Sequence, residues 1–349
     1  MTTYQPLVSI GLPVRNGERY LPGAVESLIA QDYRKLELII SDNASTDATT
    51  DICLQYAARD ERIRFQRMDT NIGAARNFNE VFEKAGGKYF MWAAHDDLFH
   101  PSYIRRCLEV LEGRPEVVLC GSKIKFVDEQ GTVVRVRSRD FNELNTHSMD
   151  LRQRVRTLTE KVGWFSLYGL LRPEALRRTR LYTEAYGGDV LLLMELLFLG
   201  TTFVLPQSLY TCRMIPKSNE QYLEDITGSR SAPASFKAFT GLAEDLLRVI
   251  EAWSGPVSLK AALREDLLEN VSQKNGFWSH AIFNENPDLA REPPYQRPVE
   301  IRALLAPETP VVELDMLRAA AHKAHKAALA AHPIRRFLER HVLWRFRWS

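Results

Sequence analysis

Short apolar runs alternate with segments of helical periodicity over the first hundred residues. Short, mainly apolar runs predict buried strands over residues 7–13, 36–40 and 89–94, and a further strand is predicted over residues 63–66. Apolar residues at helical spacing predict helices over residues 20–29, 46–58 and 74–85. Strands that alternate with helices across short connections are typical of a parallel sheet with right-handed crossovers. We therefore predict an α/β fold with a Rossmann-like, mainly parallel sheet flanked by helices.

The pattern becomes mixed and then helical further along the chain. Strand and helix signals alternate irregularly over residues 100–222, and the composition is helical from Ser235 onward. The stretch 284–310 is rich in proline and polar residues and is predicted to be a loop or linker. We expect three parts: an α/β catalytic domain at 1–222, a mainly helical region at 223–332 and a basic amphipathic tail at 333–349.

The composition is that of an ordinary globular protein. The chain has 349 residues, of which 45% are apolar and 26% charged, and this balance excludes a largely disordered protein. The cysteines stand far apart without a CxxC pair, which favours reduced, buried thiols at Cys53, Cys107, Cys120 and Cys212. No run approaches the ~20 apolar residues of a membrane-spanning helix, and no signal peptide is visible, so a cytoplasmic location is expected.

Charge is distributed unevenly along the chain. Residues 315–349 carry eight basic and two acidic residues, which leaves 38 basic and 42 acidic residues for the remainder. A mildly acidic body argues against a nucleic-acid-binding protein. In the tail, arginines are interleaved with tryptophan and other apolar residues, a pattern that suits the inner face of an anionic membrane. The same pattern is also consistent with packing on the catalytic domain or on a second subunit of a homodimer.

Polar residues follow three of the predicted strands, at 13–16, 41–43 and 95–97. In parallel sheets, ligands bind outside the carboxyl ends of the strands. The adjacent carboxylates of Asp96 and Asp97 suit a divalent cation such as Mg²⁺ or Mn²⁺, or a ribose, although one of them could cap the next helix. Asp42 could accept hydrogen bonds from a base or a sugar, or form an Asx turn. Dinucleotide-binding, P-loop, nucleophile-elbow and HExxH motifs are absent from the sequence.

Several segments resemble the opening of family 2 glycosyltransferases in order and spacing. They are Val8–Gly17, Leu28–Gln31, Glu37–Asp47, Asn71–Asn77 and Trp92–Asp97, and a weaker resemblance continues through Asp189 to about Ser218. The resemblance implies the GT-A fold, a nucleotide-sugar donor, a divalent metal and inversion at the anomeric carbon. UDP is the commonest donor nucleotide of the family. The implied acceptor is a hydroxyl of a glycan, a lipid-linked molecule or another cell-envelope molecule.

The resemblance also implies roles for individual residues at the donor site. Asp42 would read the donor base, and Pro13 and Arg15 would line the same nucleotide pocket. Arg76 matches a basic position near the donor, although an arginine on a helix surface needs no such role. His95, Asp96 and Asp97 match the metal motif, with His95 in place of its first aspartate. By the resemblance, Asp96 faces the ribose or the metal and Asp97 holds the metal.

The resemblance extends to the catalytic base and the end of the domain. Asp189 follows a Gly pair at the start of an apolar helix and matches the catalytic base of the family, while the residues alone favour an N-cap. Arg213 matches an arginine of the family and could neutralise the leaving diphosphate. Ile215 stands where members often have a histidine, which puts any contact of that histidine in doubt. Pro216 and Ser218 match the family pattern.

Two other functions are compatible with the same elements. One is a nucleotidyltransferase-like enzyme, but the expected Gly-rich loop after the first strand is missing. The other is a catalytically inert scaffold that binds a nucleotide sugar or a glycan.

Overall fold

The computed structural model describes residues 5–135, 144–161, 164–215, 237–274 and 276–331. They belong to two compact units. One unit is drawn from Met1–Phe236 and Asp245–Leu263, and the other from Lys237–Glu244 and Arg264–Ser349. Residues after 236 contribute to both units. The boundary expected at 222/223 lies outside the described residues.

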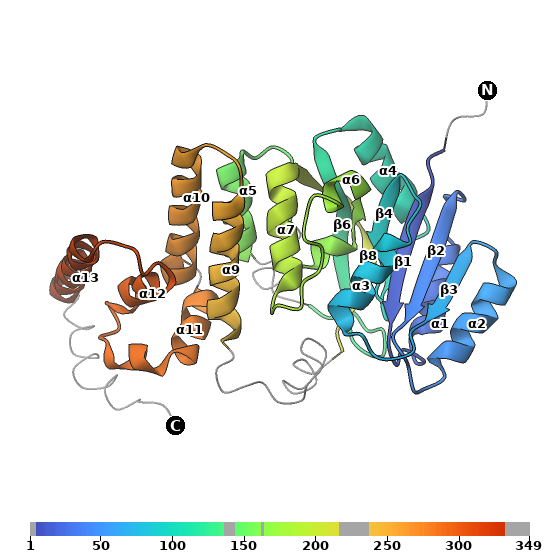
Figure 1. The fold of residues 1–349 in the computed structure, drawn as a ribbon, viewed down its shortest axis with the longest axis horizontal. Coiled ribbons are helices and arrows are strands. Elements are labelled where there is room, and N and C mark those ends of the chain that lie inside the picture. Colours follow the sequence, from blue (N-terminus) through green and yellow to red (C-terminus); the bar gives the residue numbers. More distant parts are fainter. Residues whose placement is uncertain (1–4, 136–143, 162–163, 216–236, 275, 332–349) are drawn as a thin grey trace. The chain divides into compact units, whose positions relative to one another are not determined.

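The described part of the first unit is built on an eight-stranded sheet in the order β3-β2-β1-β4-β7-β6-β8-β5 (Figure 1). The strands are β1 (Val8–Val14), β2 (Leu36–Asp42), β3 (Ile63–Arg67), β4 (Tyr89–Trp92), β5 (Leu98–Phe99), β6 (Val117–Val127), β7 (Leu170–Leu171) and β8 (Thr201–Arg213). Strands β3, β2, β1 and β4 are parallel, as predicted. Beyond β4 the sheet is mixed: β7 and β5 run antiparallel to their neighbours, while β6 and β8 pair in parallel.

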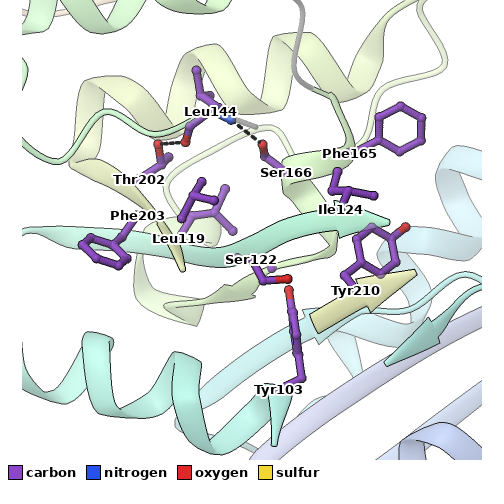
Figure 2. A pocket seen from close by; sticks show the side chains of 13 residues that line it. Tyr103, Leu119, Ser122, Ile124, Leu144, Phe165, Ser166, Thr202, Phe203 and Tyr210 are labelled. Atoms are coloured by element: carbon purple, nitrogen blue, oxygen red, sulfur yellow. Dashed lines mark hydrogen bonds between the residues drawn. The ribbon is translucent and has the colours of Figure 1, made fainter. Parts of the chain in front are cut away.

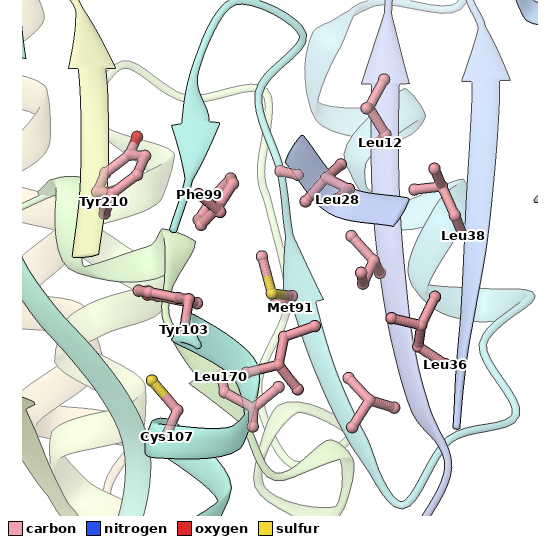
Figure 3. Close-up of a cluster of buried hydrophobic side chains, with 14 of the residues drawn as sticks. Leu12, Leu28, Leu36, Leu38, Met91, Phe99, Tyr103, Cys107, Leu170 and Tyr210 are labelled. Atoms are coloured by element: carbon pink, nitrogen blue, oxygen red, sulfur yellow. The ribbon is translucent and has the colours of Figure 1, made fainter. Parts of the chain in front are cut away.

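Helices cover both faces of this sheet. They are α1 (Leu21–Ile29), α2 (Thr49–Arg59), α3 (Ala74–Glu83), α4 (Tyr103–Gly113), α5 (Leu151–Lys161), the short η1 (Trp164–Tyr168), α6 (Pro173–Leu176) and α7 (Gly188–Leu199). Alternate residues of β1 and β2 pack with α1 and α4 in one buried apolar cluster, shown in Figure 3. On the other face, α3 lies so close to β1 that a side chain at Gly11 would meet Val81 at 2.6 Å. A strand buried on both faces reads as a continuous apolar run, which explains the pattern of residues 7–13.

The chain after residue 236 is helical in its described residues, as expected. The elements are α9 (Ala238–Ala252), α10 (Val257–Glu269), the π-helical η2 (Asn270–Lys274), α11 (Gly276–Glu285), η3 (Pro287–Arg291), α12 (Arg297–Leu305) and α13 (Val311–Ala331). No helix among the described residues is long and apolar enough to span a membrane.

The prediction of a linker over residues 284–310 is wrong. This stretch contains η3 and α12, and α12 buries Val299, Ile301 and Leu305. A proline stands in the first turn of both helices. Proline is tolerated at that position because the first amide groups of a helix have no partner within it, so it begins helices here instead of interrupting them. The predicted tail at 333–349 lies outside the described residues.

Candidate active site

The loops that follow β1 and β2 are tied together by hydrogen bonds. The backbone N–H of Asn16 donates to Ser45 Oγ at 2.9 Å, and the side chain of Asn16 accepts from the N–H of Thr46 at 2.9 Å. The N–H of Gly17 donates to Thr49 Oγ1 at 2.8 Å. Asn16 has a positive φ of 52°, a conformation that asparagine adopts more readily than most residues. These bonds fix two of the three strand ends at which polar clusters were predicted.

Asp42 is fully buried at the end of β2. Its carboxylate accepts from the N–H of Ser45 at 2.9 Å and from Thr50 Oγ1 at 2.5 Å, and Arg67 Nε lies 3.5 Å away. The bond from Ser45 is a local side-chain-to-backbone contact of the Asx type that the residues alone also predicted. The other oxygen accepts from Thr50 on α2, so both carboxylate oxygens of Asp42 are engaged within the protein.

The other residues expected in the nucleotide pocket have very different surroundings. Pro13 is buried and pairs with Ser41 in the β1–β2 register, one position before Asp42. Arg15 is exposed just beyond the end of β1. Arg76 lies on α3, and its exposed guanidinium pairs with Glu184 at 2.9 Å. Arg76 therefore connects α3 with the segment that leads to α7.

The motif after β4 meets both the β1 loop and β8. The imidazole of His95 lies against Gly17, where an added side chain would come within 2.7 Å of the ring. Asp96 is half-buried, and its carboxylate makes no hydrogen bond or ion pair with any described residue. Asp97 is buried, with 3% of its surface exposed. It accepts hydrogen bonds from the Tyr210 hydroxyl and, at 2.8 Å, from the N–H of Arg213.

Burial, and then the neighbouring charge of Asp96, raises the pKa of Asp97 to about 7. Hydrogen bonds from Tyr210 and Arg213 oppose this rise by favouring the charged form. The two adjacent carboxylates are thus unlike: Asp97 points into protein, and Asp96 is the one with unused acceptor atoms.

Arg213 lies at the end of β8 and contacts this motif through the backbone. Its Nε donates to the carbonyl of Asp96 at 3.2 Å, and its Nη1 donates to the carbonyls of Asp128 and Glu129 at 3.1 Å each. Its guanidinium also lies 4.6 Å from the centre of the Tyr20 ring. Ile215 is described and half-buried, whereas Pro216 and Ser218 lie outside the described residues.

Asp189 occupies the first turn of α7, as the pattern predicted. Gly187, just before the helix, has a left-handed conformation with φ 71°. The carboxylate of Asp189 accepts from the N–H of Val190 at 2.8 Å. Burial raises the pKa of Asp189 to about 6, although backbone hydrogen bonds oppose the rise. A carboxyl group that titrates near neutral pH is suited to general base catalysis.

The sequence analysis missed residues that hold these groups in place. Tyr210, the hydroxyl partner of Asp97, lies on β8 three residues before the motif that begins at Arg213, and no motif included it. Asn79 holds the backbone of Tyr182 with two hydrogen bonds, of 2.9 and 3.0 Å. The Tyr182 ring packs against Phe78 and Trp92. Burial, and then the charge of Asp189, raises the pKa of Tyr182. The positive φ of Leu181 (59°) marks this segment but is not visible in sequence.

A small pocket lies between β6, β8 and η1 (Figure 2). Its lining is mainly apolar, and its polar atoms are partly paired with one another: the N–H of Leu144 donates to Ser166 and the hydroxyl of Thr202 donates to the carbonyl of Leu144. None of the predicted donor, metal or base residues lines it. We therefore do not assign the candidate active site to this pocket.

The protein ligands for a divalent metal are few among the described residues. No group of three or more His, Cys, Asp or Glu side chains is arranged to hold a metal ion in that part of the chain. Mg²⁺ commonly uses only one or two carboxylates, with water and substrate phosphates completing its shell. The Asp96 carboxylate, with its unused oxygens, fits such a site.

Comparison with known proteins identifies the N-terminal region. A model described as glycosyl transferase family 2 matches residues 9–172. The chain contains a family 2 glycosyltransferase domain. An uncharacterized glycosyltransferase of Rickettsia typhi is 35% identical over 125 residues, which are 35% of this chain and 38% of that protein. The putative teichuronic acid biosynthesis glycosyltransferase TuaG of Bacillus subtilis is 37% identical over 114 residues, 33% of this chain and 45% of that protein. The matches thus span less than half of these relatives.

Solved structures confirm the GT-A fold over nearly the whole chain. The crystal structure of residues 1–349 of S. aureus TarS has a TM-score of 0.60 and 17% identity, with 92% of this chain and 91% of that chain covered. The same protein in complex with UDP-GlcNAc has a TM-score of 0.61 and 16% identity, with 92% of each chain covered. The mannosyltransferase PcManGT of Pyrobaculum calidifontis, in complex with GDP-Man and Mn²⁺, has a TM-score of 0.51 and 17% identity, covering 96% of this chain and 84% of that one.

Proposed function

We propose that the protein is an inverting glycosyltransferase. It transfers a hexosyl group from a nucleotide-diphosphate sugar, with UDP as the nucleotide, to a hydroxyl of a glycan, lipid-linked or other cell-envelope acceptor. The observation that carries the proposal is Asp189, a carboxylate with a raised pKa at the first turn of α7. It belongs to the same unit as the polar residues at the ends of β1, β2 and β4. The UDP-GlcNAc complex of TarS and the name of TuaG support the donor and acceptor classes.

Asp189 is the general base of the proposed reaction. It removes the proton of the acceptor hydroxyl, whose oxygen attacks the anomeric carbon from the face opposite the nucleotide. The bond between that carbon and the diphosphate breaks, and the diphosphate leaves with the electron pair. With a pKa of about 6, Asp189 is mostly ionised at neutral pH and yet remains basic enough to accept a proton.

The donor side of the proposed site consists of the strand-end loops. Pro13, Arg15 and Asp42 bind the nucleotide, and Arg76 lies toward the sugar or diphosphate. Because both oxygens of Asp42 are already hydrogen-bonded within the protein, a base N–H would share an oxygen with Ser45 or Thr50. Asp96 would hold the metal together with the phosphates of the nucleotide sugar. Asp97, the other predicted ligand, already accepts a hydrogen bond on each of its oxygens. When bound, Mg²⁺ or Mn²⁺ supplies positive charge that stabilises the leaving diphosphate.

Donor binding and turnover test this proposal directly. We would measure thermal shifts with UDP, GDP and dTDP, each with and without Mn²⁺, and the release of UDP from UDP-sugars. Asp288→Asn is a matched control for Asp189→Asn, because Asp288 is also in a first helical turn but its side chain is 95% exposed. We expect one nucleotide to raise the melting temperature, and to do so only when Mn²⁺ is present. We also expect the unsubstituted protein and Asp288→Asn to release UDP from the donor, and Asp189→Asn not to. Nucleotide binding without any turnover would instead indicate an inert scaffold, and no nucleotide binding would overturn the proposal.

A further inference from the structure

A three-residue contact joins the metal motif to the end of β8. Strands β5 and β8 are antiparallel, with Phe99 opposite Tyr210. This pairing places Tyr210 and Arg213 beside the turn that precedes β5, where Asp97 lies. One carboxylate oxygen of Asp97 accepts from the Tyr210 hydroxyl, and the other accepts from the N–H of Arg213 at 2.8 Å. A buried carboxylate with a donor on each oxygen cannot turn without losing a hydrogen bond.

The side chain of Arg213 holds the neighbouring peptide. Its Nε donates to the carbonyl of Asp96, and its Nη1 donates to the carbonyls of Asp128 and Glu129. These are backbone acceptors, and the face of the guanidinium lies over the Tyr20 ring at 4.6 Å. An arginine used in this way fixes loop positions, because its planar fork of donors is preorganised. Nε, Nη1 and one face of the Arg213 guanidinium contact other residues of the protein, so fewer of its N–H groups can bind a phosphate of the nucleotide sugar.

The result is that Asp96 is held from both sides while its own carboxylate stays uncommitted. Its carbonyl is bound by Arg213, and the next residue, Asp97, is anchored to β8. Its half-buried carboxylate has no hydrogen-bond or ion-pair partner among the described residues.

We propose that Tyr210, Asp97 and Arg213 form a clamp that positions Asp96 for the metal-bound donor. This inference rests on the proposed glycosyltransferase function, and it assigns Tyr210, Asp97 and Arg213 as positioning residues. Asp97 then acts through Asp96 instead of as the main metal ligand. Partners that orient a metal ligand typically change metal affinity by about 10- to 100-fold when they are removed.

Tyr210→Phe tests the clamp with the smallest possible change. It removes only the hydroxyl and keeps the ring, which stacks on Phe99 at 5.0 Å. Tyr103→Phe is the matched control, because Tyr103 is also a buried core tyrosine, in edge contact with Phe99, but its hydroxyl donates to the carbonyl of Tyr168 at 2.9 Å. Both variants lose one buried hydrogen bond, so a general loss of stability affects them alike.

Two readouts separate the clamp from the proposed function. The first is amide hydrogen exchange of residues 93–99 without any ligand, which Tyr210→Phe should speed and Tyr103→Phe should leave unchanged. The second is the Mn²⁺ concentration needed for half-maximal UDP binding, which Tyr210→Phe should raise about tenfold while Tyr103→Phe changes it less than twofold. Unchanged exchange in Tyr210→Phe overturns the clamp. Failure of the unsubstituted protein to bind UDP overturns the proposed function, while the exchange result still decides whether the clamp exists.

Discussion

Three aspartates at this site differ because of what surrounds each carboxylate. Asp42 accepts from the backbone N–H of Ser45 and from the hydroxyl of Thr50 on α2. Asp97 accepts from Tyr210 and Arg213. Asp189 accepts from the N–H of Val190, and burial dominates its titration. Burial raises the pKa of Asp97 to about 7 and that of Asp189 to about 6, but Asp97 has a donor on each oxygen, which leaves Asp189 the better placed of these two to accept a proton.

Replacing Asp189 by asparagine should reduce kcat by about 10²–10⁴-fold, because an amide cannot accept the proton of the acceptor hydroxyl. Donor affinity should remain nearly unchanged, since the proposed role of Asp189 concerns the acceptor. Pre-steady-state turnover and isothermal titration with UDP measure the two effects separately. A collapse of UDP affinity with normal turnover of bound donor would make Asp189 a donor ligand or a helix cap.

The activity should also depend on pH through Asp189. The base acts in its ionised form, and its pKa is raised to about 6, so kcat should rise as the pH increases from about 5 to 7 and level off above. The limb with its midpoint near pH 6 should be missing from the residual activity of Asp189→Asn. A profile with its midpoint near pH 4 would mean that Asp189 is not desolvated in the working enzyme.

At the scale of elements, the beginning of α7 depends on backbone conformation. Gly187 adopts φ 71° before the helix, and a side chain at Gly188 would meet the carbonyl of Thr183 at 2.6 Å. The first of these glycines permits a left-handed turn and the second permits a close approach of the chain. Together they determine the direction in which α7 leaves the preceding segment, and hence the place of Asp189.

Gly187→Ala should lower the free energy of unfolding by about 1 kcal/mol, because an L-residue is strained in the left-handed conformation. It should also reduce kcat, because it disturbs the turn that carries Asp189. Gly113→Ala is the control: Gly113 ends α4, and an added methyl there meets nothing within 4 Å. Urea denaturation should show Gly113→Ala to be neutral or slightly stabilising. Equal stabilities of the two variants would contradict the strain at Gly187.

At the scale of the whole molecule, the composition of the C-terminal tail bears on the location of the protein in the cell. The tail at 333–349 contains Trp344 and Trp348 among five arginines and one glutamate. Basic residues near an anionic membrane surface each contribute about 1 kcal/mol, and tryptophan favours the interface. We therefore propose that the tail attaches the protein to the inner face of the cell membrane.

Sedimentation with anionic liposomes at low salt tests this attachment. Full-length protein should pellet with the vesicles, and a version that ends at His332 should remain in the supernatant. Pelleting should decline as salt is raised, because the attraction is electrostatic. If neither protein pellets, the tail packs on protein instead. A change from dimer to monomer upon truncation, seen by light scattering, would then identify a second subunit as its partner.

The burial of individual strands explains which elements could be predicted from the sequence. Residues 7–13, 36–40 and 89–94 are mainly apolar because β1, β2 and β4 are buried in the sheet, and clusters of polar residues follow the end of each strand. Parallel strands bring those ends to one edge, so the predicted alternation of strands and helices was enough to propose that the polar clusters lie near one another. The helices η3 and α12 were missed because proline in a first turn has the same local signal as proline in a loop.

Contacts between distant segments had no such signal. Asp96 and Asp97 are chemically identical neighbours, and no pattern of apolar and polar residues distinguishes them. Only the pairing of β5 with β8 brings Tyr210 and Arg213, 113 and 116 residues away, onto the carboxylate of Asp97. That contact leaves the carboxylate of Asp96 uncommitted. The type of each residue is written in the chain, but its charge, its donors and its freedom to bind depend on which remote segments the fold places against it.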